Sequence, residues 1–206
     1  MEPTDLNRRA FDDLHRRRRV SREGLPPIVK ATLGDLSSKR VLHLHSGGGA
    51  STAELAELGA VVTAVDPDER ALDVAREQWP SILWIVGDAQ ALPAELRRGR
   101  FDLVYSPEGT LWRLRDLDAW AAGLGAALQE RGELLVYETH PVALCVDGLQ
   151  RWHYDYFADG FWRLGRLATT LVRAGFQIEA LEEYPAGSVG GDRRLPGTFL
   201  LYARRA

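Results

Sequence analysis

The stretch RVLHLHSGGGASTAELAELGAVVTAVDP, residues 40–67, decides the fold. It begins with a short apolar run, breaks at Gly47, Gly48 and Gly49, and continues with helical spacing before a second apolar run ends at Asp66. A strand, a glycine turn, a helix and another strand in this order are typical of a parallel sheet with crossover helices. Because glycine lacks a Cβ, the turn also permits backbone N–H groups to approach a ligand closely.

The same alternation continues along the chain. Apolar runs predict strands, and helical patterns lie between them, as in a parallel sheet that is covered on both faces. The segments FQIEALEEY and GTFLLYARR are joined by a glycine-rich loop too short for a crossover helix, so they must pair antiparallel. We therefore predict an α/β, doubly wound (Rossmann-like), seven-stranded, mostly parallel sheet with an antiparallel last strand and helices on both faces. The expected strands before the closing pair are 41–45, 61–65, 82–86, 101–105 and 133–138, and the expected helices are 51–58, 68–78, 116–128 and 163–174.

Length and composition are typical of one domain. The 206 residues are 45% hydrophobic, enough to bury one substantial core. We predict a single domain over 1–206, with 1–36 as an N-terminal helical segment that forms a lid. No run of 18 uncharged apolar residues occurs, and the single cysteine, Cys145, agrees with a reducing compartment. A cytoplasmic protein is the expectation.

The charge is unevenly distributed. Residues 1–40 contain ten Lys and Arg against six Asp and Glu, so they carry +4, whereas the remainder carries −7. Four of these ten cations lie in the run His15–Arg19, which could attract nucleic acid. No aromatic residues are interleaved with it, and such a run is typical of a solvated helix face. Nucleic acid is therefore not the expected partner.

The glycine turn and the acidic residue after the second strand predict an adenosine-type ligand. In doubly wound sheets, ligands bind outside the carboxyl ends of the strands. Asp66 follows Gly49 by 17 residues, where a carboxylate can accept hydrogen bonds from both ribose hydroxyls. The dinucleotide fingerprint G-x-G-x-x-G is broken because Thr52 stands three residues after Gly49, and no Gly-Lys-Ser/Thr of a phosphate loop follows.

Four segments, VLHLHSGGG, VTAVDPDERALDVAR, IVGDAQALP and FDLVYSPEGTLWRLRDLDAWAAGLGAALQERGELLVYETHP, resemble the nucleotide-binding motifs of class I S-adenosylmethionine-dependent methyltransferases. The resemblance covers roughly 38–206 and is greatest to a small, poorly characterised bacterial group. It implies S-adenosylmethionine as cofactor and S-adenosylhomocysteine as product. By this resemblance, glycines line the methionine end, one aspartate binds the ribose, and a second binds the adenine amino group with a neighbouring backbone N–H; these residues are Gly47, Gly49, Asp66, Asp88 and Ala89.

The chain departs from this family at two histidines. The usual acidic residue and first glycine of D-x-G-x-G-x-G are replaced by His43 and His45. The backbone carbonyl of His45 would still contact the cofactor's amino group. The two side chains, at i and i+2, are expected on one face of the strand. Catalytic zinc needs three protein ligands and no third is evident, so we predict no metal and two structural histidines.

Two residues after the fourth and fifth strands are candidates for acid–base chemistry. Methyl transfer from a sulfonium has a neutral leaving group, so a base is needed only when the nucleophile must lose a proton. His140 in ETHP and Glu108 in SPEGT face the expected substrate space, and an imidazole titrates near neutrality. Each could instead serve a local structural role.

An aromatic segment, DGLQRWHYDYFADGFW at 147–162, is a candidate acceptor pocket. Aromatic clusters line small-molecule sites, although they also pack loops onto a core. We take Trp152, Tyr154 and Tyr156 as its candidate lining. The loop 184–197 is a second candidate cover, which would exclude water from the substrate.

The sequence therefore predicts an S-adenosylmethionine-dependent methyltransferase that acts on a small molecule at O, N or C. One alternative is a non-catalytic cofactor-binding or regulatory protein that keeps the fold. A less favoured one is an RNA methyltransferase guided by the arginine run. No membrane association is expected, and monomer and homodimer both remain open.

Overall fold

The computed structural model describes residues 3–18, 24–147, 149, 151–186 and 192–206. Its seven-stranded sheet has the order β3-β2-β1-β4-β5-β7-β6, in which β7 is antiparallel to both of its neighbours. Strands β1 to β5 are parallel, as predicted from their apolar runs. The strands are β1 (Arg40–Leu44), β2 (Val61–Asp66), β3 (Leu83–Val86), β4 (Phe101–Ser106), β5 (Leu128–Thr139), β6 (Phe176–Pro185) and β7 (Pro196–Arg205).

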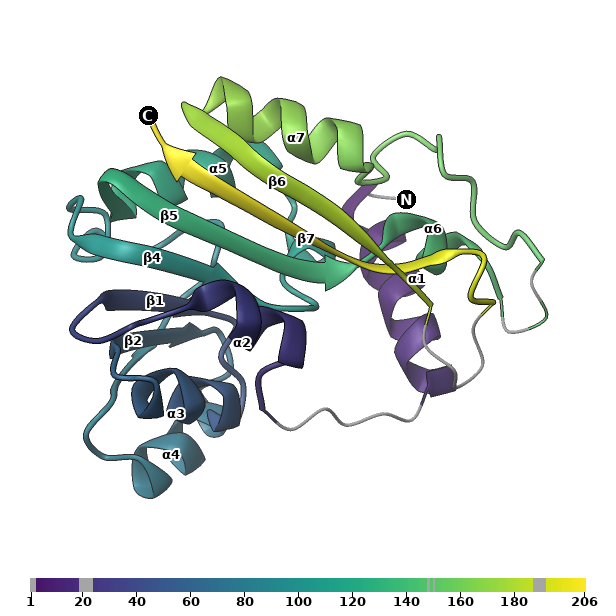
Figure 1. Cartoon of the computed structure of the whole chain (residues 1–206). Coiled ribbons are helices and arrows are strands. Elements are labelled where there is room, and N and C mark those ends of the chain that lie inside the picture. Colours follow the sequence, from purple (N-terminus) through teal and green to yellow (C-terminus); the bar gives the residue numbers. More distant parts are fainter. Residues whose placement is uncertain (1–2, 19–23, 148, 150, 187–191) are drawn as a thin grey trace.

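Helices cover both faces of this sheet (Figure 1), which confirms the predicted fold class. Alternation along the strands separates the two cores. Leu42 and Leu44 face the core under α5 and α7, whereas Val41 packs with residues of α2 and α3. The helices are α1 (Pro3–Arg18), α2 (Pro27–Leu33), α3 (Ala50–Glu57), α4 (Glu69–Gln78), the 3₁₀ turn η1 (Leu111–Arg113), α5 (Leu117–Ala127), α6 (Pro141–Cys145) and α7 (Leu164–Arg173).

Strand β5 is longer than the sequence predicts. It begins at Leu128, directly after α5, whereas the apolar run predicted a start at 133. The intervening residues are mostly polar and carry no apolar signal, and Arg131 has a left-handed φ of 58°. The first residue of β5 nevertheless pairs with β4. Phe101 of β4 lies opposite Leu128, and the register between the two strands then shifts.

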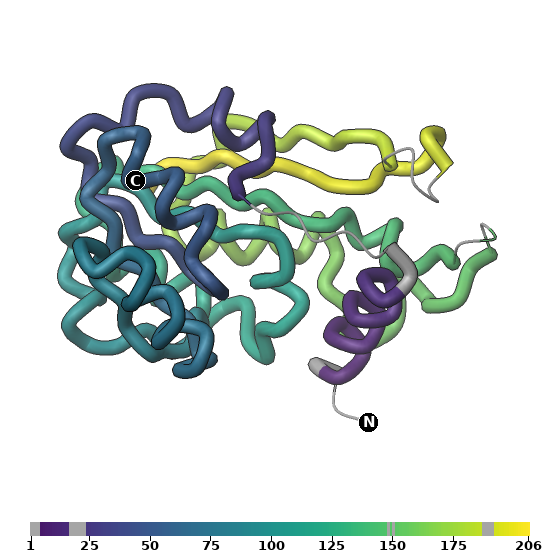
Figure 2. Tube along the Cα trace, turned by 90° about the horizontal axis from the view of Figure 1, so that it is seen from below, coloured from purple at the N-terminus to yellow at the C-terminus, as the bar shows by residue number. Residues whose placement is uncertain are grey.

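Helix α1 packs at the carboxyl end of the sheet, next to the connection that follows α6 (Figure 2). Ala10, Phe11 and Leu14 are buried in the same core as α5 and α7. Asn7, which is fully buried, donates from its amide to the Gly160 carbonyl at 2.8 Å and accepts from the Trp162 N–H at 2.9 Å. These reciprocal bonds fix α1 against the connection. In the described ranges, no helix has the length and apolar character of a membrane span.

Candidate active site

The glycine turn lies at the carboxyl end of β1, in the middle of the sheet. Gly47 and Gly49 have φ values of 54° and 92°, which side chains rarely adopt. A Cβ on Gly49 would lie 2.7 Å from the Trp84 ring, so this glycine is required by packing. A Cβ on Gly47 would meet nothing within 4 Å. Gly47 therefore borders open space at the position where the sequence predicts the cofactor's methionine end.

Asp66 ends β2 beside this turn and is 7% exposed. Its Oδ2 accepts from the Gly47 N–H and its Oδ1 from the Asp68 N–H, both at 2.8 Å. Each carboxylate oxygen has two acceptor sites, so both retain capacity for a ligand hydroxyl. The carboxylate thus holds the glycine turn in shape and can still bind a ribose.

Asp88 lies near the same edge, because β3 runs parallel to β2 and Val86 pairs with Asp66. Its carboxylate is exposed and accepts from the Gln90 N–H at 3.0 Å. The Gln90 side-chain oxygen accepts in turn from the Arg115 and Asp116 N–H groups at the start of α5. The neighbouring Ala89 is buried. The adenine-side loop is therefore held in place by bonds within the chain.

His43, which stands where the family usually has an acidic residue, lies against Thr52, the residue that breaks the dinucleotide fingerprint. His43 is fully enclosed, its ring stacks on Tyr105 at 5.1 Å, and its Nδ1 lies 2.8 Å from the hydroxyl of Thr52. Thr52 occupies the position of the third fingerprint glycine, and its hydroxyl bonds the residue that replaces the family's acid. Burial lowers the pKa of His43 to about 3, so the ring stays neutral. Among the described residues His43 Nε2 has no hydrogen-bond partner, so the ring is satisfied only at Nδ1.

His45 keeps the conformation of the glycine that it replaces. Its φ is 42°, in the left-handed region that glycine adopts without strain and histidine occupies less readily. Strand β1 ends at Leu44, so the alternation that predicted one shared face for the two histidines stops before His45. Burial lowers the pKa of His45, and Asp66 raises it in opposition. Among the described residues, no group of three His, Cys, Asp or Glu side chains gathers as a metal site.

Several buried polar atoms at the carboxyl ends of β1 and β4 lack a hydrogen-bond partner in the described part of the chain. They are His45 Nδ1, Ser46 Oγ, Ser106 Oγ and Thr110 Oγ1. Such atoms are costly unless a ligand or water satisfies them. Together with the open space at Gly47 and the acceptor capacity of Asp66, they fit a polar ligand with ribose and amino-acid parts. The sequence pattern did not single out Ser106 and Thr110, because serine and threonine are unremarkable in such turns.

Glu138, at the end of β5, anchors the loop after β4. Its buried carboxylate accepts from the N–H groups of Gly109, Leu111 and Thr139, at 2.7 to 3.2 Å. Burial raises the pKa of this carboxyl well above its usual value, and the nearby charge of Glu108 raises it further, while the three N–H donors oppose both. The position of η1 therefore depends on one buried side chain.

Glu108, a candidate base, lies in this loop. Its Oε1 accepts a 2.5 Å hydrogen bond from the Thr139 hydroxyl, and the residue is partly buried. It lies at the carboxyl edge, as expected, with one oxygen already engaged.

His140, the other candidate base, follows β5 and is 3% exposed. Its Nδ1 accepts from the Val142 N–H at 3.1 Å and caps α6, so the ring proton is on Nε2, which lies 2.7 Å from Glu183 Oε1. Burial lowers the pKa of His140, and Glu183 raises it in opposition. In this conformation Nδ1 is engaged as an acceptor and Nε2 lies within ion-pair distance of Glu183, and the catalytic role of His140 stays a prediction.

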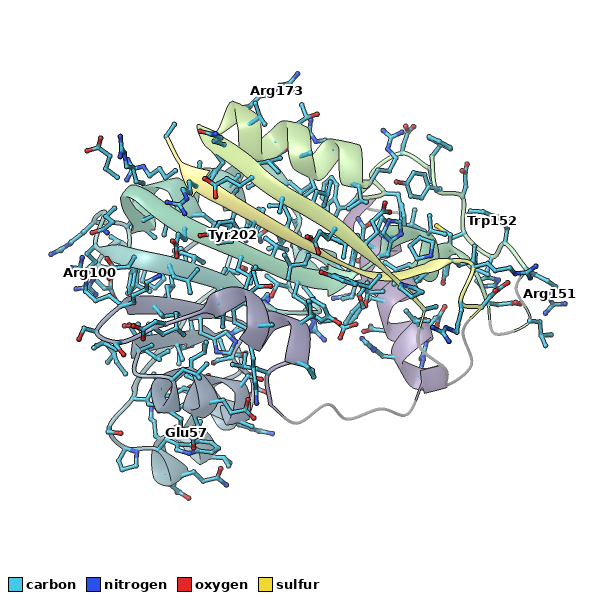
Figure 3. All side chains as sticks on the ribbon, viewed as in Figure 1. Glu57, Arg100, Arg151, Trp152, Arg173 and Tyr202 are labelled. Carbon is cyan, nitrogen blue, oxygen red and sulfur yellow. The ribbon has the colours of Figure 1, made fainter. Side chains whose placement is uncertain are left out.

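The three aromatic candidates do not share one environment. Trp152 is 65% exposed on the outer part of the connection (Figure 3). The Tyr154 hydroxyl donates to Asp13 of α1 at 2.5 Å, and Tyr156 packs against Phe161. The two tyrosines therefore join the connection to α1 and the core, whereas Trp152 stands apart from them. The candidate cover at 184–197 includes 187–191, which lie outside the described residues.

Comparison with known proteins identifies the class. A family model described as "Methyltransferase domain" matches residues 41–132. An uncharacterized methyltransferase from Synechocystis is 38% identical over 166 residues, which cover 73% of each chain. A demethylmenaquinone methyltransferase from Beutenbergia cavernae is 32% identical over 62% of this chain and 55% of that protein. This chain belongs to the class I S-adenosylmethionine-dependent methyltransferases.

A solved structure supports the fold. The crystal structure of an S-adenosylmethionine-dependent methyltransferase from Mesorhizobium loti matches with a TM-score of 0.73 and 24% identity, covering 87% of this chain and 96% of that one. The chain spans only 19% and 30% of the length of two other curated relatives, a bifunctional biotin-biosynthesis protein from Cellvibrio japonicus and an uncharacterized methyltransferase from Mycobacterium bovis.

Proposed function

We propose that this protein transfers a methyl group from S-adenosylmethionine to a small-molecule acceptor. The observation that carries the proposal is the open space at Gly47, bordered by Asp66 and by unsatisfied buried polar atoms. Asp66 would accept hydrogen bonds from the ribose hydroxyls, and Asp88 would accept one from the adenine amino group. The His45 carbonyl would accept one from the amino group of the cofactor's methionine part. A relative named for demethylmenaquinone supports a small acceptor.

The chain's contribution to the reaction would be binding, alignment and exclusion of water. S-adenosylmethionine supplies a methyl group on a sulfonium, which needs no further activation. The glycine turn and the polar groups around it would hold the cofactor in line with the acceptor. Such alignment can lower a large part of the barrier to a displacement reaction. Glu108 and His140 lie at the ends of β4 and β5, from where either could take a proton from an acceptor.

We also propose that residues 1–36 cover the site as part of a single domain. Phe11 and Leu14 of α1 share a core with α5 and α7, and Asn7 binds the connection after α6. Residues 19–23 of this segment, which include Arg19 of the basic run, lie outside the described residues.

Calorimetric titration with S-adenosylmethionine and S-adenosylhomocysteine tests the cofactor. We expect micromolar affinity for both, and an increase of Kd of about a hundredfold in Asp66→Ala, because a charge-assisted acceptor and the support of Gly47 are lost. Asp73→Ala is the matched control, because this exposed aspartate of α4 pairs with Arg76 of the same helix. Equal affinity in wild type and Asp66→Ala would contradict the assignment.

A non-catalytic cofactor-binding protein is the second candidate, and the internal bonds of His140 and Glu108 favour it. Incubation with methyl-labelled S-adenosylmethionine and small-molecule extracts separates the two. Transfer of label to any acceptor supports the enzyme, whereas cofactor binding without transfer supports the binding protein.

A further inference from the structure

Arg113 is a cation held close to the glycine turn. It is the last residue of η1, and its side chain is exposed. Its guanidinium carbon lies 5.6 Å from the centre of the Phe11 ring of α1, a cation–π geometry. A Cβ on Gly109 would lie 3.6 Å from Arg113 Nη1 and 3.0 Å from the Phe11 ring. The arginine is therefore confined between the loop after β4 and the N-terminal helix.

The loop that carries Arg113 follows β4, which pairs in parallel with β1, so it lies at the same edge of the sheet as the glycine turn. The positive charge of Arg113 reaches His45, whose pKa it lowers in addition to the effect of burial, while Asp66 and Asp88 act in the opposite direction. In the part of the chain that the structure describes, the Arg113 side chain makes no hydrogen bond and no ion pair, and only its backbone N–H is bonded, to the Thr110 carbonyl. A guanidinium has five donors, so its hydrogen-bonding capacity is unused at the edge of the open space.

Other cations near β1 are less suited to a ligand at this edge. Arg40 begins β1, at the opposite end of the strand, and bonds Asp102. Arg16 of α1 pairs with Asp13. Unlike Arg40 and Arg16, Arg113 both lies at this edge of the sheet and has side-chain donors available.

We propose that Arg113 binds the carboxylate of the cofactor's methionine part and that Phe11 of α1 holds it in position. This inference rests on the proposed function. The planar fork of a guanidinium matches a carboxylate with two parallel hydrogen bonds, and stacking on an aromatic ring leaves those donors free. The N-terminal helix is then a component of the cofactor site, and its docking and cofactor binding strengthen each other.

Two ligands that differ in the amino-acid part test the inference. S-adenosylhomocysteine carries the carboxylate, whereas 5′-methylthioadenosine keeps the adenosine and sulfur but lacks the amino acid. In Arg113→Met we expect the Kd of S-adenosylhomocysteine to rise about tenfold, the loss of a charge-assisted pair at an exposed site. The Kd of 5′-methylthioadenosine stays unchanged. Arg98→Met, which removes the same charge at an exposed position before β4, leaves both affinities unchanged.

Further variants separate the guanidinium from its support. Arg113→Lys keeps the charge but not the fork, so its affinity for S-adenosylhomocysteine falls between wild type and Arg113→Met. Phe11→Leu removes the aromatic face and retains the apolar contact, and we expect a weakening of about threefold for S-adenosylhomocysteine alone. Circular dichroism of each variant checks that the fold is kept.

Two outcomes overturn the inference while leaving the proposed function intact. If Arg113→Met weakens the affinity for both ligands equally, the arginine serves the structure of the loop. If its affinity for S-adenosylhomocysteine is unchanged, the carboxylate of that ligand binds elsewhere. Wild-type protein that binds neither ligand is a different result, because it removes the proposed function and this inference together.

Discussion

The cofactor side and the acceptor side of the sheet's carboxyl edge are built differently. Beside the glycine turn, His45, Ser46 and Ser106 keep buried polar atoms unsatisfied, and Gly47 borders open space. On the acceptor side, polar groups are bonded within the chain, as in the contacts of His140 with Glu183 and of Tyr154 with Asp13.

Because of this difference, binding of the cofactor and binding of the acceptor would require different changes in the protein. A cofactor on the first side gains hydrogen bonds without breaking any, so that side is preorganised. An acceptor on the second side must displace contacts between α1, the connection after α6 and β6. If the acceptor binds as proposed, we expect its entry to require movement of these segments, as with the lids of other enzymes. The predictions below test the two sides, from the largest effect to the smallest.

Glu138 ends β5 and holds the loop after β4. We expect its replacement to give the largest change in stability. In Glu138→Ala, three buried N–H groups lose their acceptor, so we expect the free energy of unfolding to fall by about 3 kcal/mol or more. Urea denaturation measures it. Glu138→Gln, which retains one acceptor oxygen, loses less, and the exposed Glu130→Ala on the same strand is the control. An unchanged midpoint in Glu138→Ala would show that the loop is held by other contacts.

Asn7 tests how firmly the acceptor side is closed. Asn7→Ala removes two buried hydrogen bonds between α1 and the connection, which lowers the free energy of unfolding by about 2 kcal/mol. Trypsin should also cut faster at Arg8 and Arg9 of α1 in the variant. Arg8→Ala, which removes an exposed pair with Asp5, is the control for stability. If cleavage at Arg9 does not accelerate in Asn7→Ala, α1 is held independently of this residue.

His43 tests the cofactor side through pH. Its pKa is about 3 in the folded protein and 6.5 when unperturbed, so the unfolded chain takes up a proton as the pH falls through 6.5 while the folded chain does not. Stability contributed by the neutral ring is complete above pH 6.5 and decreases between 6.5 and 3. Relative to pH 7, the loss at pH 5 is about 2 kcal/mol.

The double variant His43→Leu, Thr52→Ala removes the titrating group and its partner, so its unfolding free energy should vary less between pH 7 and 5 than that of wild type. The difference between the two proteins excludes the contributions of His45 and His140, which titrate in both. An equal decrease in both proteins would show that His43 ionises normally in the fold.

Glu183 gives the smallest effect. Its charge opposes the lowering of the His140 pKa by burial, and Glu183 is half exposed, so its influence is screened. In Glu183→Gln the attraction is lost and His140 titrates at a lower pH, which NMR of the ring protons detects. A midpoint equal to or above that of wild type would show that this carboxylate does not act on the imidazole.

The sequence was sufficient for the sheet and for the backbone of the cofactor site, but not for the side-chain partners. Apolar runs, the glycine turn and the short β6–β7 loop each have a local signature, so strand order and direction follow from general rules. The bonds of Asn7, of Glu138 and of His140 join residues far apart in sequence or depend on exact rotamers. The pairing of His43 with Thr52 had a local signal, because His43 replaces the acid of the methyltransferase motif and Thr52 lies only nine residues later, in the first turn of α3.

The hydrogen bonds of Asn7 also constrain how the protein is made. Its partners, Gly160 and Trp162, follow it by 153 and 155 residues. Helix α1 leaves the ribosome well before these partners, and it cannot reach its native contacts until residues 160–162 have been synthesised. During translation its apolar face, with Phe11 and Leu14, is therefore exposed to solvent or covered by non-native contacts. A nascent chain halted before residue 160 would therefore expose this face to chaperones.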